Sequence, residues 1–204
     1  MKKLCLISLL IAFSLLCFAG IDEYYSFNAT TGTYTPITGT TIDNISSDDA
    51  LSTAIPIGFS FPFGDAVYTN VMVSSNGWIG LGTGFDSSWL SNELISTVQV
   101  PVLAPLWDDT SLAGGSASYL LTGTAPNRIF TVQYQSLQWN YWADNSIDFQ
   151  VRMYESGKID FIYGPMTNDP ANASASIGIN MLPGGTGWFY SITPGVVPGF
   201  STTV

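Results

Sequence analysis

The sequence predicts an all-β protein, an antiparallel β-sandwich of two sheets with a jelly-roll-like architecture. Many short runs of β-branched and aromatic residues are separated at close intervals by Gly, Pro, Asn and Asp. One of them, residues 130–135, alternates strictly between apolar and polar side chains, as a half-buried strand does. Amphipathic helices longer than one or two turns are absent, which excludes a parallel α/β fold.

The first nineteen residues resemble a secretory signal peptide. Two lysines make a basic start, residues 4–16 are apolar, and small side chains lie one and three positions before an expected cleavage after Ala19. A transmembrane anchor is the weaker interpretation, because the apolar run is short and polar chain follows at once. We therefore expect residues 1–19 to be removed and the rest of the chain to be secreted or held at the cell surface.

Beyond the signal peptide we expect one domain at residues 20–193 and a tail or linker at residues 194–204, which is rich in Pro, Gly, Ser and Thr. Both cysteines, Cys5 and Cys17, precede the expected cleavage site. The chain has no histidine. The processed protein therefore has no disulfide, and catalysis by Ser-His-Asp or Cys-His groups and zinc sites made of histidine or cysteine are excluded.

The charge of the processed chain is strongly negative. Three basic residues face fifteen acidic ones, a net charge of −12. Nucleic acids and anionic membrane surfaces are poor partners for such a chain, whereas divalent cations are plausible ones.

Residues 57–82 are the densest packet of apolar, β-branched and turn residues in the processed protein. Asn76-Gly77 lies between two strand-like runs and predicts a hairpin with a two-residue type I′ turn. That register pairs Val73 with Gly80 and leaves room above the glycine for a bulky group from the opposing sheet.

A second hairpin is predicted around Gly157. A two-residue loop would place Met153 opposite Asp160, with a carboxylate on the apolar face. A three-residue loop with Gly157 in the left-handed region instead pairs Met153 with Ile159 and Arg152 with Asp160. We choose the three-residue loop.

Prolines limit two other segments. Pro36 makes residues 33–37 an edge strand, and two prolines in residues 100–107 keep that apolar segment away from the middle of a sheet. Residues 46–51 contain Ser and Asp, which could cap one helical turn or form a loop.

Asp108 and Asp109 follow an apolar run and precede a Gly-rich loop, and this makes them a candidate Ca²⁺ site. Oxygen ligands could also come from Asn76 or from backbone carbonyls. The alternative is that both carboxylates accept backbone N–H bonds where the chain turns, since no spaced Asp-x-Asp-x-Asp loop is present. No sequence feature pairs two acids as a glycosidase requires.

Three large aromatics, Trp139, Tyr141 and Trp142, lie in a polar stretch after a predicted strand. They could stack on sugar rings or fill a partner's pocket. Alternatively, Trp139 and Tyr141 continue the core face of the strand and Trp142 covers an end of the sandwich.

A series of short motifs occurs in order between residues 55 and 192. They are Phe59-Ser60-Phe61-Pro62-Phe63-Gly64, Tyr68-Thr69-Asn70-Val71, Val73-Ser74-Ser75-Asn76-Gly77-Trp78, Ala104-Pro105-Leu106-Trp107-Asp108-Asp109, Phe130-Thr131-Val132-Gln133-Tyr134, Tyr154-Glu155-Ser156-Gly157 and Ala175-Ser176-Ile177-Gly178-Ile179. This series resembles the β-sandwich modules of large exported bacterial surface proteins and, more distantly, the nidogen-type extracellular domain.

The resemblance implies a non-catalytic module in adhesion or surface assembly, with an extracellular protein or glycan as its partner. The chain could be part of a longer surface protein, and no cofactor is required beyond possible Ca²⁺. The alternative function is a carbohydrate-binding module that uses the exposed aromatics, and a secreted hydrolase is a distant third.

Overall fold

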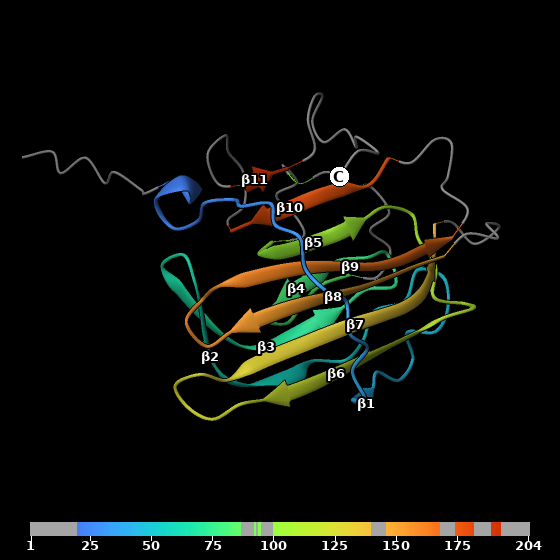
Figure 1. The fold of residues 1–204 in the computed structure, drawn as a ribbon, viewed down its shortest axis with the longest axis horizontal. Coiled ribbons are helices and arrows are strands. Elements are labelled where there is room, and N and C mark those ends of the chain that lie inside the picture. Colours follow the sequence, from blue (N-terminus) through green and yellow to red (C-terminus); the bar gives the residue numbers. More distant parts are fainter. Residues whose placement is uncertain are drawn as a thin grey trace, which may run out of the picture.

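The computed structural model describes residues 20–86, 92, 94, 100–139, 146–167, 174–181 and 189–192. It confirms the all-β antiparallel sandwich, with two sheets packed on each other (Figure 1). The five-stranded sheet has the order β1 (Thr40–Thr41), β6 (Ser116–Thr122), β7 (Ile129–Gln138), β8 (Ser146–Tyr154) and β9 (Ile159–Thr167). The six-stranded sheet has the order β11 (Phe189–Ser191), β10 (Ser176–Asn180), β5 (Val102–Trp107), β4 (Ile79–Leu81), β3 (Ala66–Val73) and β2 (Ile55–Phe63). One short 3₁₀ turn, η1 (Ile21–Glu23), precedes the strands.

Most neighbouring strands are also consecutive in the chain. Strands β2 to β5 build one side of the sandwich, β6 to β9 build the other, and β10 and β11 return to the first. The predicted signal peptide and the predicted tail at residues 194–204 lie outside the described residues.

The core lies between the sheets and follows the alternation of the strands. Every second residue of β2 from Ile55 to Phe63 is buried, and Phe130, Val132 and Tyr134 of β7 point inward as predicted. The inner face of β8 adds a further set of fully or almost fully buried side chains: Ile147, Phe149, Val151 and Met153. Burial of these apolar side chains is the main stabilising contribution to such a fold.

Strand β5 corrects the prediction made from its prolines, because it lies inside the six-stranded sheet, between β4 and β10. Pro105 fits there for two reasons. Ladder pairs with the short strand β4 involve only Val102 and Leu103, and a register shift in the pairing with β10 falls beside Pro105. The Pro105 carbonyl accepts a hydrogen bond from Tyr163 Oη of the opposite sheet, at 2.6 Å.

The second hairpin prediction is confirmed. Met153 pairs with Ile159, Arg152 pairs with Asp160, and Gly157 ends the three-residue loop at φ +91°. The Asp160 carboxylate takes its hydrogen bonds from Tyr154 Oη at 2.7 Å and Lys158 Nζ at 2.9 Å.

The first hairpin prediction is wrong by one residue. Val73 pairs with Ile79, and Gly80 pairs with Met72, so the loop has three residues. Gly77 has φ +73°, whereas Asn76 does not adopt a positive φ, so the turn is not type I′. The space above Gly80 is filled by Phe85 of the following loop instead of by the opposing sheet.

Residues 33–41, which we name the strap, cross the outer face of the five-stranded sheet (the blue segment in Figure 1). The edge strand predicted for residues 33–37 is wrong, because only Thr40–Thr41 pairs with a neighbour, β6. Beneath the strap, Gln133 and Gln150 are completely buried although they lie on the outward, polar face of their strands. The strap gives these amides their partners, and that is why polar residues occupy buried positions here.

Strand β2 is an edge of the six-stranded sheet within the described residues. Its outward positions include Pro56, Gly58 and Pro62, and Gly58 has φ +88°. The register with β3 shifts between Pro56 and Phe61, as expected of a bulge.

Candidate functional site

The turn between β3 and β4 is buried and joins three segments of the chain. Asn76 is inaccessible to solvent. Its Nδ2 donates to Asp49 Oδ1 at 3.0 Å, and its Oδ1 accepts from the Thr110 backbone N–H at 3.1 Å. Gly77 is required next to it, since a Cβ there would lie 1.9 Å from the Leu106 carbonyl oxygen. Asn76 therefore faces the acidic residues with its amide nitrogen.

Tyr134 holds the same turn from the opposite sheet. Its hydroxyl lies 3.0 Å from the carbonyl oxygen of Ser74 and 3.1 Å from that of Trp78, and it donates its one proton to this pair of acceptors. Complete burial raises the pKa of Tyr134 well above its ordinary value, so the hydroxyl stays protonated and acts as a donor.

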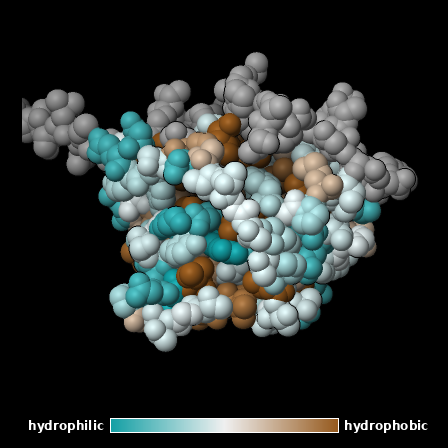
Figure 2. Space-filling view, in the orientation of Figure 1, coloured by the Kyte–Doolittle hydropathy of each residue, from teal (hydrophilic) through white to brown (hydrophobic). Residues whose placement is uncertain are grey.

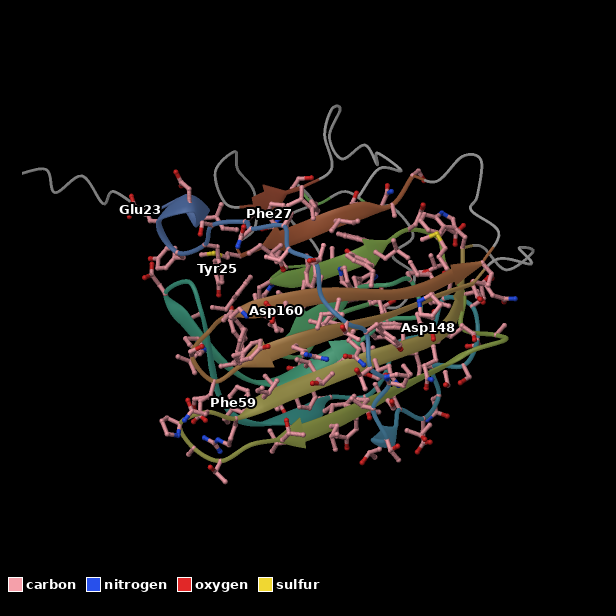
Figure 3. The ribbon with its side chains drawn as sticks, viewed as in Figure 1. Glu23, Tyr25, Phe27, Phe59, Asp148 and Asp160 are labelled. Carbon is pink, nitrogen blue, oxygen red and sulfur yellow. The ribbon has the colours of Figure 1, made fainter. Side chains whose placement is uncertain are left out.

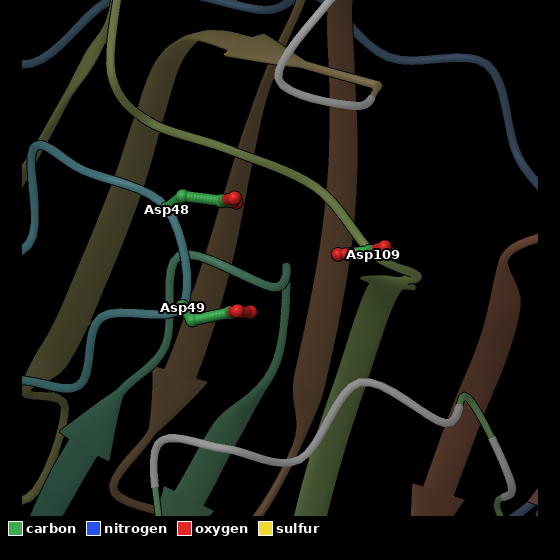
Figure 4. Close-up of side chains that lie close together, drawn as sticks. All are labelled: Asp48, Asp49 and Asp109. Atoms are coloured by element: carbon green, nitrogen blue, oxygen red, sulfur yellow. The ribbon is translucent and has the colours of Figure 1, made fainter.

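Asp48, Asp49 and Asp109 form a cluster of carboxylates, which we name the acidic cluster (Figure 4). A carboxylate oxygen of each residue lies within 4.8 Å of the other two. Burial, followed by the charges of Asp49, Asp48 and Asp108, raises the pKa of Asp109. Burial and the charge of Asp49 likewise raise the pKa of Asp48, against a backbone hydrogen bond that lowers it. Three carboxylates this close could supply oxygen ligands to a hard cation such as Ca²⁺.

Asp108 points away from this cluster. Its carboxylate accepts from the Asp109 backbone N–H at 2.9 Å and from the Ser174 hydroxyl at 2.8 Å and 3.0 Å. The Ser174 backbone N–H donates to it as well, at 3.2 Å. This is the turn-forming role of the alternative prediction, and Asp108 connects the segment before β10 to the end of β5.

Of the three residues predicted to bind calcium, the structure thus brings Asp109 to a set of acids, places Asn76 beside that set as a donor, and turns Asp108 elsewhere. Asp48 and Asp49 were missed as cluster members, because the Ser-Asp run had suggested a helix cap or a loop. It forms a loop, with a β-bridge from Asp48 to Ser111. The sequence separates these acids from Asp109 by about sixty positions, and only the sandwich topology brings them together.

Trp139 is 6% exposed and belongs to the core between the sheets, as the packing alternative predicted. Its ring therefore offers no open face to a sugar. Tyr141 and Trp142 lie outside the described residues.

A cleft of about 500 Å³ opens between the residues after η1, the β2–β3 hairpin and the β8–β9 hairpin. Tyr25 and Asp160, both labelled in Figure 3, line it together with polar side chains such as Asn28, Ser156 and Lys158. Among the lining residues Asp160 is the one carboxylate, and Lys158 and Tyr154 already engage it. The two converging acids of a glycosidase do not occur in this cleft.

Within the described residues, no helix is long and apolar enough to span a bilayer. Comparison with curated proteins and with solved structures yields no match. A family model described as NIDO related matches residues 24–204, which is nearly all of the chain after the predicted signal peptide, and the chain therefore belongs to the NIDO-related family.

Proposed function

We propose that this chain is a non-catalytic module that acts in adhesion or assembly at a cell surface. The observation that carries the proposal is the family match, which covers both sheets of the sandwich. A NIDO-related domain is an extracellular type of module and not an enzyme family. The signal-peptide pattern and the absence of histidine and mature cysteine support this assignment.

The first test is export. Expression of the full chain in a bacterial host should yield a secreted protein whose amino terminus is Gly20, read by mass spectrometry. A chain that stays inside the cell with its first residues attached would contradict the extracellular assignment.

The second test is surface association. Purified, fluorescently labelled chain should bind intact cells of the producing strain in a saturable way, and excess unlabelled chain should compete. Heat-unfolded chain is the control for unspecific adherence. Absence of saturable binding to cells would refute the proposed role.

Calcium remains a prediction and now rests on Asp48, Asp49 and Asp109, whose carboxylates lie together. Since a ligand that binds only the folded state raises stability, the melting temperature should be higher in excess Ca²⁺ than in chelator. Asp109→Asn should abolish the difference, while Asp65→Asn, which changes an acid outside the cluster, should preserve it. Equal melting temperatures in Ca²⁺ and chelator for the unchanged chain would remove the calcium prediction.

The carbohydrate-binding alternative now depends on Tyr141 and Trp142, since Trp139 packs in the core. Glycan binding that disappears on Trp142→Ala with an unchanged melting temperature would favour it. Trp139→Ala is expected to destabilise the fold instead.

A further inference from the structure

The strap is held to the sheet mainly through its backbone. Gln133 Oε1 accepts from the Ile37 N–H at 2.8 Å, and Gln133 Nε2 donates to the Ile37 carbonyl at 3.3 Å. Gln150 Nε2 donates to the Thr35 carbonyl at 2.7 Å and to Gln133 Oε1 at 2.8 Å. The two glutamine side chains therefore bind the backbone of an extended segment through hydrogen bonds, much as a neighbouring strand does.

One side chain of the strap, that of Tyr34, packs on a glycine of the sheet. A Cβ at Gly164 of β9 would lie 2.8 Å from Cγ of Tyr34, so the tyrosine ring lies directly on the bare glycine. The Tyr34 hydroxyl reaches Gln133 Oε1 at 3.3 Å. The surface formed by Gln133, Gln150 and Gly164, which we name the track, thus accepts an extended segment. That segment has a tyrosine three positions before the residue whose backbone bonds to Gln133.

The strap itself buries little apolar surface, and the apolar anchor of this part of the chain is Ile21, which packs in the core ahead of it. Of residues 33–41, only Tyr34, Ile37 and Gly39 are partly buried, and all the others are exposed. Residues 26–33, which precede Tyr34, are exposed throughout. Figure 2 shows that this face is largely hydrophilic to neutral, with separate apolar spots. Segments with few buried apolar contacts open at low free energy.

When the strap opens, Gln133 and Gln150 lose their bonds to its backbone and become exposed to water. Where identical chains lie close together, as the assembly role proposed above requires, the strap of another copy offers the same backbone groups and the same tyrosine. Exchange of an identical segment keeps every contact and is a low-cost route to association.

We infer that the track is an assembly site that accepts the strap of a second copy of this chain. In the exchanged form, residues 33–38 of one copy lie on the five-stranded sheet of its partner, and β1 stays paired with β6. The residues before the strap, with the core residue Ile21, move to the partner as well. This inference rests on the assembly role proposed above and names the partner, a second copy, and the surface that receives it.

Cysteine cross-linking tests the exchange, because the processed chain has no thiol of its own. One chain carries Tyr34→Cys, and the other carries Gly164→Cys together with Tyr34→Ala. The alanine prevents a clash between the strap of the second chain and its new cysteine side chain. The two Cβ atoms lie at most about 4.3 Å apart, within the roughly 3.5–4.5 Å that a disulfide needs. The chains are refolded together at two concentrations, oxidised and analysed by non-reducing electrophoresis.

Two control variants give reference values for the yield of disulfide. Tyr34→Cys and Gly164→Cys in one chain should form an internal disulfide at high dilution. Gly84→Cys replaces Tyr34→Cys as the measure of random collision, since Gly84 lies outside the exchanged segment and a Cβ there has no neighbour within 4 Å. Exchange predicts a heterodimer yield roughly tenfold or more above this control, because the tethered thiols meet at a high effective concentration. The yield should also rise with protein concentration.

A heterodimer yield equal to that of the Gly84 control overturns the inference. Failure of the internal disulfide overturns it as well, because it would show that the strap does not rest on Gly164. The cell-binding assay separates the two proposals. Background cross-linking with normal cell binding overturns exchange alone, whereas cross-linked exchange without cell binding overturns the cell-surface role alone.

Discussion

Replacing Gln133 by Ala should release the strap without unfolding the sandwich. The substitution removes the two contacts with the Ile37 backbone, the contact with the Tyr34 hydroxyl and the one with Gln150. A net contribution of about 0.5–1.5 kcal/mol for each hydrogen bond, with the long ones at the lower end, gives roughly 1.5–3 kcal/mol for the strap contacts. Since about 1.4 kcal/mol corresponds to a factor of ten, the opening equilibrium of the strap should rise roughly 10–100-fold.

Hydrogen exchange at the Ile37 amide reports the release, because the acceptor of this amide in the closed strap is Gln133 Oε1. Its protection should fall by at least that factor, while amides paired between β7 and β8 should change much less. Gln135→Ala is the matched control, since Gln135 lies two residues further along the same strand and the hydrogen bonds that hold the strap come from Gln133 and Gln150. Unchanged protection at Ile37 in Gln133→Ala, or an equal fall in Gln135→Ala, would show that Gln133 does not hold the strap on the sheet.

Three further substitutions test the buried turn and the acidic cluster. Tyr134→Phe keeps the ring and removes one buried donor, and it should lower the free energy of unfolding by about 1–2 kcal/mol in urea titration. An unchanged free energy would mean that the hydrogen bonds to the Ser74 and Trp78 carbonyls do not stabilise the fold. Gly77→Ala should lower it by more than about 2 kcal/mol, because it combines a positive φ with backbone contact at Leu106, whereas Gly84→Ala, at φ +92° in open space, should lower it by about 1 kcal/mol. Asp109 holds its proton more tightly in the folded than in the unfolded chain, so it lowers stability as the pH rises above its ordinary pKa of 3.8. Asp109→Asn should therefore raise the melting temperature at pH 7 in chelator; a decrease would show that the carboxylate is stabilised by a partner.

The two hairpins show how far the sequence could specify strand register. At Gly157, one of the two loop lengths places Asp160 on the apolar face, and that penalty selects the other. At Gly77 no acid marks the wrong choice, and the familiar Asn-Gly pair suggested a shorter turn. The pairing of Val73 with Ile79, apolar on both sides, was a signal available in the sequence that would have selected the observed register.

The remaining errors come from contacts between distant segments. Pro105 is tolerated inside the sheet because β4 is short and the ladder with β10 is irregular beside it, and neither fact is visible in residues 100–107. Gln133 looks like an exposed residue of an alternating strand, because the strap that buries it comes from almost a hundred positions earlier. The acidic cluster has the same origin, since Asp49 and Asp109 meet only when both sheets are in place.

The prolines and the bulge along the edge strand β2 have a consequence for contacts between copies of this chain. Pro56 and Pro62 have no N–H to offer an incoming strand, and the kink at Gly58 interrupts any straight row of acceptors. This edge is therefore a poor template for the strand of a neighbouring molecule, and growth of a continuous sheet from it is disfavoured.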